Sequence, residues 1–408
     1  MMRKTELFSE AFSQLPLLEL VERSHCTSQA EWDLAMQSGP ASLERFAALI
    51  SPESGRHLEE LAGRARQWTL QRFGKVIRFF APLYLSNECV NNCQYCGFSR
   101  DNPILRVTLN VDEVLREARA LREAGFRHLL LVSGEHPKFA SNRYMADCVA
   151  AIRSEIPSIS LEVGPMEVDD YRACVEAGAE SLVVYQETYD RTVYQQVHTS
   201  GPKKKFDWRL DTPERAYEAG FRRLGIGALF GLSDWRYEAL AVAAHVMHLQ
   251  KHCWKSQLTI SLPRLRPHAG DFEPRTTLPN REMVQLISAF RVTFPDLGIV
   301  LSTREPAVLR DGLLPLGITH MSAGSHTEPG GYTGVGNDKL HVTRRGRVEG
   351  LSEEQEKEVA SAEAGCTRAT GQFDIADERS VEEVVAVVRS QGYEVVWKDW
   401  DPVLSEAG

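Results

Sequence analysis

Short apolar runs alternate with amphipathic stretches through the middle of the chain, from residue 76 to residue 325. This alternation predicts parallel strands joined by helical crossovers. Eight runs have the length and composition of strands, and that count favours a closed α/β barrel of the TIM type, (β/α)8. An open doubly wound sheet is the alternative, but it usually has fewer strands and a Gly-rich first turn, which this sequence lacks. The predicted strands cover residues 76–85, 128–132, 160–163, 181–185, 223–229, 257–262, 298–302 and 320–323.

A tripeptide repeat supports the same fold. The sequence Glu-Ala-Gly occurs at 123–125, 176–178 and 218–220, each time shortly before a predicted strand. In each copy the glycine stands where a helix can end in a left-handed residue, a conformation that glycine adopts without strain. The repeat therefore indicates one βα unit used several times. In such a barrel the active site lies at the carboxyl ends of the strands.

The sequences on either side of the barrel have different patterns. Residues 1–75 predict a polar helical segment, a collar whose apolar positions recur at helical spacing and pack on the main domain. Residues 76–325 are expected to form the barrel domain. Residues 326–408 predict a flexible covering segment up to about residue 371 and then a helical tail, which begins with a capping box at 380–383 and ends near Trp397 and Trp400.

Composition narrows the class of protein. With 408 residues, of which 43% are hydrophobic and 25% charged, the chain can bury a large core. A net charge of −9 argues against nucleic acid or an anionic membrane surface as a partner, and we interpret the basic run at 203–205 as a solvated loop face. No apolar run has transmembrane length and no signal-type stretch follows the first residues, so we expect a cytoplasmic protein without a membrane partner.

Three cysteines follow the first predicted strand. Cys89, Cys93 and Cys96 have the spacing C-x3-C-x2-C, which lets one loop supply three thiolates to a cubane iron–sulfur cluster. The fourth iron is then open to a substrate or cofactor. A structural zinc site is the alternative, but such sites usually close with a second C-x2-C or an H-x3-H pair, and none follows.

Polar residues follow the predicted strands where a barrel places its active site. Residues 133–135, Glu162 and residues 186–187 bring carboxylates to three successive strand ends. At the last two strands, Arg304 and Ser322 present a fixed cation and a hydroxyl, which suit the carboxylate of an amino acid. The sequence therefore predicts one mouth that combines a thiolate-bound cluster with an amino-acid site.

A family resemblance makes this chemistry more specific. The cysteine spacing, with Tyr95 before the last cysteine, resembles the signature of the radical S-adenosylmethionine enzymes. The longer string formed by 83–87 and 96–99 resembles the tyrosine lyases of thiamine biosynthesis, the 2-iminoacetate synthases. The resemblance implies a 4Fe-4S cluster and S-adenosyl-L-methionine as cofactors, and cleavage of the Cα–Cβ bond of L-tyrosine to 2-iminoacetate (dehydroglycine) and p-cresol. It also implies thiazole synthase and a flavodoxin- or ferredoxin-type electron donor as partner proteins.

The resemblance implies a role for each residue at the mouth. Cys89, Cys93 and Cys96 hold the cluster, while Arg304 and Ser322 hold the substrate carboxylate. Ser133, Gly134 and Glu135 are implied to bind the amino group of S-adenosyl-L-methionine, and Glu162, Gln186 and Glu187 its amino or ribose end. Arg209 is implied to bind its carboxylate, and the backbone at Gly227 and Ala228 its adenine. Tyr95 is also among the residues implied to contact this cofactor.

Three other functions fit part of the sequence. A hydrogenase-maturation tyrosine lyase shares the barrel and the bond cleavage but carries a second cluster on a carboxy-terminal cysteine motif, and after Cys253 this chain has only Cys366. The second alternative is a radical S-adenosylmethionine lyase of another aromatic amino acid. The third is a metal-binding regulatory or scaffold protein without catalysis. Arg264 and Arg266, after the sixth predicted strand, fit the pocket and a structural ion pair equally well.

Overall fold

The eight predicted strands close into a barrel. In the computed structural model, described for residues 7–37, 39–344, 347–361 and 365–398, each barrel strand pairs in parallel with its neighbours. β11 closes the ring against β1, with Phe80 opposite Ser322. The prediction of a TIM-type (β/α)8 barrel is therefore confirmed. The barrel strands are β1 (Val76–Ser86), β4 (His128–Ser133), β5 (Ser158–Glu162), β6 (Ser181–Val183), β8 (Arg223–Gly227), β9 (Gln257–Ser261), β10 (Gly298–Leu301) and β11 (His320–Ser322).

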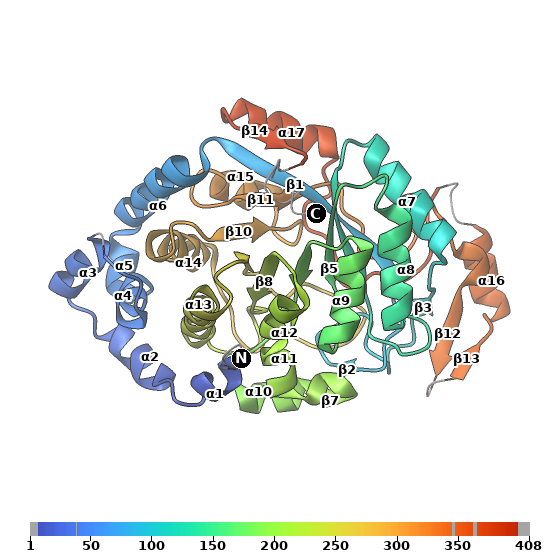
Figure 1. Cartoon of the computed structure of the whole chain (residues 1–408), viewed down its shortest axis with the longest axis horizontal. Helices are drawn as coiled ribbons and strands as arrows, with labels where there is room; N and C mark the ends of the chain where they lie inside the picture. Colours follow the sequence, from blue (N-terminus) through green and yellow to red (C-terminus); the bar gives the residue numbers. More distant parts are fainter. Residues whose placement is uncertain (1–6, 38, 345–346, 362–364, 399–408) are drawn as a thin grey trace.

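Helices between the strands cover the outside of the barrel (Figure 1). The first of them, α7, begins with a capping box in which Asn110 and Glu113 each accept a hydrogen bond from the backbone of the other. The three glycines of the repeated tripeptide, at 125, 178 and 220, have φ angles of 104°, 122° and 111°, as predicted for left-handed helix ends. The crossover elements are α7 (Val111–Glu123), α8 (Asn142–Ile152), α9 (Val168–Ala177), α10 (Arg191–Val197), β7 (His198–Ser200), η1 (Pro202–Lys204), α11 (Phe206–Leu210), α12 (Thr212–Ala219), α13 (Trp235–His252), α14 (Asn280–Thr293) and α15 (Ala307–Leu313).

The amino-terminal helices pack on one side of the barrel, the left of Figure 1. α6 lies against α14, and α4 lies against both α13 and α14. The rings of Phe46 and Phe290 have their centroids 4.6 Å apart, and Leu61 is fully buried. This collar is therefore attached by apolar packing, as its sequence pattern predicts. Its helices are α1 (Phe8–Phe12), α2 (Leu17–His25), α3 (Gln29–Met36), α4 (Leu43–Leu49), α5 (Pro52–Arg56) and α6 (Leu58–Phe73).

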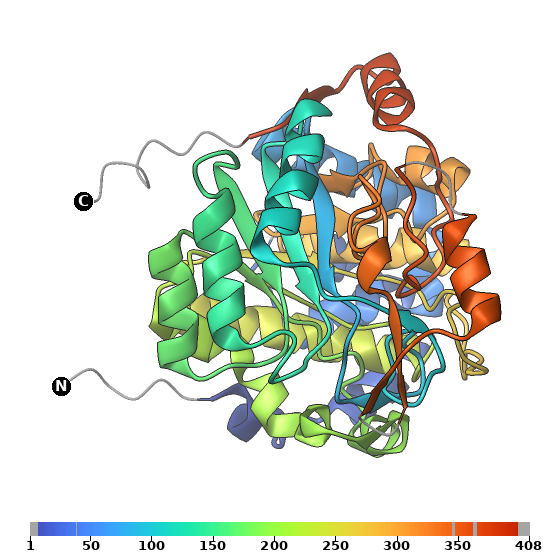
Figure 2. The ribbon, with the colours of Figure 1, turned by 90° about the vertical axis from the view of Figure 1, so that its right-hand side faces the viewer.

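The segment that follows β11 lies at the carboxyl ends of the strands, and Figure 2 shows its orange and red ribbon over one half of the barrel. β12 pairs antiparallel with β13 and with β3, which leads out of the cysteine loop. The sequence predicts a flexible segment here; the short strands of this sheet carry no alternating pattern that would predict them. The elements in this part of the fold are β2 (Asn92–Cys93), β3 (Leu105–Arg106), η2 (Asn337–Lys339), β12 (His341–Arg344), β13 (Arg347–Glu349) and α16 (Glu353–Ala360).

The carboxy-terminal tail returns to the barrel. α17 (Val381–Ser390) begins with the predicted capping box of Ser380 and Glu383. After it, β14 (Glu394–Val396) pairs in parallel with the start of β1. Trp397 then packs edge-on against Phe126, with ring centroids 5.4 Å apart, whereas Trp400 lies outside the described residues. The tail thus adds a strand to the barrel sheet. The division of the chain into three domains at residues 75 and 325 stays a prediction.

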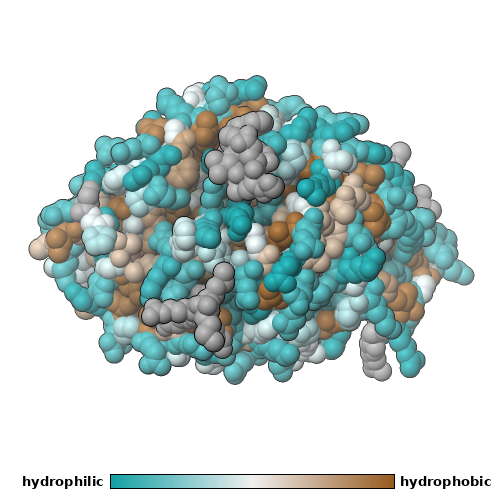
Figure 3. Space-filling model, viewed as in Figure 1, coloured by the Kyte–Doolittle hydropathy of each residue, from teal (hydrophilic) through white to brown (hydrophobic). Residues whose placement is uncertain are grey.

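The outer surface is mixed in character. On the face shown in Figure 3, hydrophobic residues lie scattered between hydrophilic ones. In the part of the chain that the structure describes, no helix combines the length and the apolar character needed to span a lipid bilayer.

Candidate active site

The cysteine loop leaves the end of β1 and folds over the mouth of the barrel. The side-chain amide of Asn91 donates to Glu135 Oε2 at 2.7 Å and to Cys89 Sγ at 3.7 Å. The backbone N–H of Val90 donates to the carbonyl oxygen of Glu135 at 2.8 Å. Gly134 permits this close approach, because a Cβ there would collide with the backbone carbonyl that precedes Cys89. The loop is thus held on the end of β4, beside the predicted residues.

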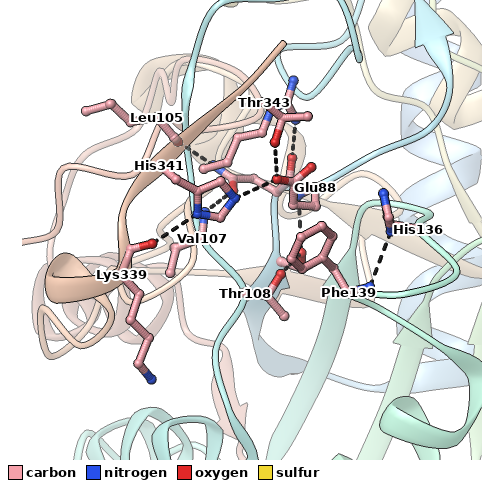
Figure 4. Close-up of polar contacts among 12 residues, drawn as sticks. Glu88, Leu105, Val107, Thr108, His136, Phe139, Lys339, His341 and Thr343 are labelled. Atoms are coloured by element: carbon pink, nitrogen blue, oxygen red, sulfur yellow. Dashed lines mark hydrogen bonds and ion pairs between the residues drawn. The ribbon is translucent and has the colours of Figure 1, made fainter. Parts of the chain in front are cut away.

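The residue before the first cysteine ties the loop to the carboxy-terminal segment (Figure 4). Glu88 is buried, and one of its carboxylate oxygens accepts hydrogen bonds from His341 Nε2 at 2.7 Å and Thr343 Oγ1 at 2.6 Å. Burial alone would raise the pKa of Glu88, but these two hydrogen bonds outweigh it and the pKa is lowered. The ring of His341 also stacks on Phe139, with centroids 5.9 Å apart. β12 therefore fixes the start of the cysteine loop.

Cys89, Cys93 and Cys96 line one cavity of about 90 Å³ at the mouth. Burial raises the pKa of Cys93 and of Cys96, so without a metal both thiols keep their protons at neutral pH. Among the described residues, no three His, Cys, Asp or Glu side chains are placed to hold a metal ion. In a cubane each thiolate binds a different iron, so three thiols on the wall of one cavity can supply three of its corners.

An ion-paired trio lies beside the thiols in the same cavity. Glu187 lies 2.7 Å from Lys203 Nζ and 3.4 Å from Arg209 Nη2. Burial alone would raise the pKa of Glu187, but the two cations lower it. The φ angle of Glu187 is 72°, a left-handed conformation that is strained for a residue other than glycine and is typical of functional sites. The interpretation of 203–205 as a solvated face is wrong for Lys203, whose ammonium group is largely buried in an ion pair with Glu187.

A second cavity of about 60 Å³ adjoins the first and contains the residues predicted for the substrate. Arg304 and Ser322 line it, and Glu162 and Tyr185 line both cavities. The guanidinium of Arg304 lies 3.3 Å from the ring centre of Phe373, which fixes the plane of the cation. Burial raises the pKa of Glu162 to about 7, although Arg304 acts in the opposite direction. The mouth therefore places a cation suited to a carboxylate next to a carboxyl group that titrates near neutral pH.

The structure brings five of the ten predicted cofactor residues to the first cavity, together with the three cysteines. They lie at or after the ends of β1, β4, β5 and β6, four neighbouring strands, as the barrel fold predicts. Besides the three cysteines, the predicted residues on its wall are Ser133, Glu135, Glu162, Glu187 and Arg209.

Five predicted cofactor residues line neither of the two mouth cavities, namely Tyr95, Gly134, Gln186, Gly227 and Ala228. Tyr95 is buried, with its hydroxyl 2.6 Å from Nε2 of His198. Gln186 is also buried, and its amide donates to a backbone carbonyl of α11 at 3.4 Å. A Cβ at Gly227 would collide with the carbonyl oxygen of Ser261 and crowd the ring of Tyr185. Ala228 is fully buried. Their contacts with S-adenosyl-L-methionine stay predictions.

Arg264 is a structural residue. Its guanidinium makes a two-point contact with the carboxylate of Glu305 and donates to the carbonyl of Leu278 at 2.9 Å. Neither Arg264 nor Arg266 lines the two mouth cavities. Of the two interpretations that the sequence leaves open, the ion pair therefore holds for Arg264.

Sequence reasoning missed the residues that the carboxy-terminal segment contributes to the mouth. Gln372 lines the first cavity with its Nε2 3.8 Å from Cys96 Sγ, and its carbonyl accepts from the N–H of Gly97 at 3.0 Å. The hydroxyl of Tyr84 donates to the side chain of Gln372 at 2.8 Å. Phe373 lines the second cavity. Two isolated residues in a polar segment give no periodic signal, so only the path of the chain in space reveals them.

Comparisons with known proteins agree with this site. Residues 83–243 match the Radical SAM superfamily, and residues 261–394 match the Biotin and Thiamin Synthesis associated domain. The chain is 39% identical to the 2-iminoacetate synthase of Escherichia coli (strain K12) and 38% identical to that of Salmonella typhimurium (strain LT2). Both comparisons extend over 401 residues and cover 98% of each chain.

The fold is similar to solved structures of HydG, a maturase of the FeFe-hydrogenase. One has a TM-score of 0.80 at 30% identity and covers 94% of this chain and 79% of that chain. The structure from Carboxydothermus hydrogenoformans has a TM-score of 0.79 at 33% identity, covering 94% and 83%. Because the identity to the two bacterial synthases extends over almost the whole of each chain, this protein belongs to the 2-iminoacetate synthase family of radical S-adenosylmethionine enzymes.

Proposed function

We propose that this protein cleaves the Cα–Cβ bond of L-tyrosine, giving 2-iminoacetate for the thiazole of thiamine and p-cresol as the second product. One observation carries the proposal beyond family membership. The cavity that holds the three thiols shares Glu162 and Tyr185 with the cavity that holds Arg304 and Ser322. A cofactor bound at the thiols is therefore next to an amino acid bound at the arginine.

The groups around the thiols are suited to a 4Fe-4S cluster and to S-adenosyl-L-methionine. When bound, these two cofactors supply the radical chemistry. The protein supplies three thiolates, a carboxylate for an ammonium group at Glu135, and cations for a carboxylate at Lys203 and Arg209. Because Glu187 already holds Lys203 and Arg209 in place, these cations are preorganised before a ligand arrives.

The substrate end of the mouth is suited to an amino acid. A guanidinium held flat by Phe373 offers two parallel N–H donors, which match the two oxygens of a carboxylate. Ser322 contributes a buried hydroxyl that accepts from the backbone N–H of Thr303 at 3.2 Å and has its own proton free to donate. Glu162 offers an acceptor for the ammonium group on the wall shared with the first cavity.

The instability of the product and the need for a reductant indicate two partner proteins. An imine such as 2-iminoacetate hydrolyses in water, so a covered mouth and direct transfer to thiazole synthase prevent its loss. A flavodoxin- or ferredoxin-type protein is the electron donor, because the cofactor chemistry needs a reductant of low potential. A location in the cytoplasm, together with these partner proteins, is part of the proposal.

Product identification tests the proposal. The protein is reconstituted anaerobically with iron and sulfide, then given S-adenosyl-L-methionine, a reductant and either L-tyrosine or L-tryptophan. We expect p-cresol, glyoxylate from hydrolysed 2-iminoacetate, and 5′-deoxyadenosine with tyrosine, and no cleavage of tryptophan. Cleavage of tryptophan instead would identify a lyase of another aromatic amino acid, and no product with either would contradict the proposed activity.

A further inference from the structure

The inside of the barrel below the mouth is unusually open and polar. A (β/α)8 barrel is normally filled by layers of branched apolar side chains. Here the inward positions of four neighbouring strands carry small residues, and a cavity of about 60 Å³ lies among them. These small residues are Ser160, Ser181, Gly225, Thr259 and Ser261.

This inner cavity continues from the amino-acid cavity. The two share a ring of mainly apolar side chains, so a ligand held at the mouth can extend from one into the other. A planar apolar group matches the surface of this ring. The shared residues are Phe80, Leu130, Tyr185, Ser261 and Val300.

Beyond the shared ring the cavity has a polar floor. His128, His320 and Arg223 line it, and Nε2 of His128 lies 2.7 Å from the hydroxyl of Ser160. Burial, with the nearby Arg223 acting in the same direction, lowers the pKa of His128 to about 3 and that of His320 well below its usual value, so both rings are neutral at physiological pH. Arg223 is itself paired with Glu180 at 3.7 Å, so the two imidazoles are the uncharged hydrogen-bonding groups that the floor offers to a hydroxyl.

Nε2 is the nitrogen of His320 that is left for a ligand. The hydroxyl oxygen of Thr319 accepts from the backbone N–H of Ile299 at 2.9 Å, and it lies 3.1 Å from the carbonyl oxygen of Ile299 and 2.8 Å from Nδ1 of His320. Nδ1 is therefore occupied by this hydroxyl, and Nε2 can hydrogen-bond a group in the cavity, as acceptor or donor according to the tautomer.

The floor lies at a suitable depth. His320 and Ser322 are two residues apart on β11 and line the inner and the amino-acid cavity, respectively. Two residues of a strand advance about 6.6 Å. The α-carbon and the hydroxyl of tyrosine are separated by a similar distance, so a tyrosine whose amino-acid end lies beside Ser322 has its phenol near the level of His320.

We propose that the inner cavity is the pocket for the phenol of the substrate, with the phenol hydroxyl hydrogen-bonded to Nε2 of His320 and the His128–Ser160 pair beside it. This inference rests on the proposed function. It makes His320 a specificity-determining residue, since a phenylalanine in the same pocket leaves a buried ring nitrogen without a hydrogen-bond partner, a mismatch that sites of this kind reject strongly.

Ligand binding without turnover tests the pocket. The reconstituted protein with S-adenosyl-L-methionine but without reductant is titrated with L-tyrosine and L-phenylalanine by calorimetry. We expect wild type to bind tyrosine at least about 100-fold more tightly than phenylalanine, and His320→Leu to bind the two within a few-fold of each other. His320→Gln, which restores an amide acceptor, should regain part of the preference. His25→Leu, at an exposed histidine of α2, is the control and should bind as wild type does.

The outcomes separate this inference from the proposed function. If wild type forms p-cresol but His320→Leu keeps the wild-type preference for tyrosine, the pocket assignment is overturned while the activity stands. If wild type forms no product from tyrosine, the proposed function itself is contradicted. Should His320→Leu fail to fold, Ser160→Ala removes the partner of His128 with little change in volume. Ser160→Ala is expected to reduce the preference for tyrosine by several-fold, and an undiminished preference would again overturn the assignment.

Discussion

The two segments that flank the barrel contact different parts of it. The amino-terminal collar packs by apolar side chains against α13 and α14, and its ring contact between Phe46 and Phe290 is typical. The carboxy-terminal segment reaches the mouth through individual polar contacts, such as His341 with Glu88 and Gln372 with the cysteine loop. The collar therefore contributes stability from outside the barrel, while the carboxy-terminal segment completes the site.

This contrast decides which substitutions should affect catalysis. Removing a collar contact should lower the free energy of unfolding without changing the mouth. Removing a contact of the carboxy-terminal segment should disturb the cavities even where little stability is lost. The following predictions are ordered by their expected effect on tyrosine cleavage.

Asp377→Ala should have the largest effect. Asp377 and Arg310 form a fully buried ion pair, and Arg310 also donates to the backbone carbonyl of Ser322. Removing the carboxylate leaves a buried cation unpaired, so we expect a loss of about 3–5 kcal/mol in the free energy of unfolding. Tyrosine turnover, measured as p-cresol, should fall by about 100-fold, because Ser322 and residues 372–373 both shift. Glu378→Ala, at the exposed neighbour, is the matched control, and equal turnover in the two variants would contradict this role of Asp377.

Phe373→Ala should act on substrate binding. The ring supports the guanidinium of Arg304 from a residue of the carboxy-terminal segment. Loss of this cation–π contact should raise KM for tyrosine by about 10-fold with a smaller change in kcat. Phe373→Tyr keeps the ring and should behave as wild type. An unchanged KM in Phe373→Ala would show that the carboxy-terminal segment does not contribute to tyrosine binding through this ring.

The ion pair of His326 with Glu328 should make the start of the segment sensitive to pH. The two side chains lie 2.9 Å apart, and the hydrogen bond to Glu328 raises the pKa of His326. A raised histidine pKa gives stability that is present in full below the unfolded pKa of about 6.5 and is lost as pH rises through the folded value. Because the pair is partly exposed, the loss between pH 6 and pH 9 should be under about 1 kcal/mol. His326→Gln should abolish this part of the pH dependence in urea titrations, and an unaltered profile would refute it.

Phe46→Ala should affect stability alone. Phe46 is fully buried in the collar, and truncation of such a ring costs about 3–5 kcal/mol. At a temperature well below the unfolding transition, kcat and KM for tyrosine should stay within about 2-fold of wild type. A large loss of turnover in the folded variant would show that the collar shapes the site and would remove the contrast between the two segments.

The contrast also explains what the sequence could predict. The eight strands, the helix-ending glycines and the three cysteines depend on local patterns and short spacings, and the structure contains them. The sequence is misleading at Lys203, because a run of charges indicates a solvated face until its partner, Glu187, is known from the fold. Gln372 and His341 could not be found at all, since each meets the cysteine loop from more than 200 residues away. Contacts between distant residues without a repeating pattern require the structure.

The most direct test of the account compares two buried cysteines. Cys93 lines the mouth cavity, whereas Cys148 is fully buried on α8 and does not line it. After anaerobic reconstitution, tyrosine-dependent 5′-deoxyadenosine and p-cresol are measured for wild type, Cys93→Ala and Cys148→Ala. We expect equal amounts of both products from wild type and Cys148→Ala, and neither product nor iron–sulfur absorption from Cys93→Ala. Continued turnover by Cys93→Ala would contradict the thiol-bound cluster on which the site is built.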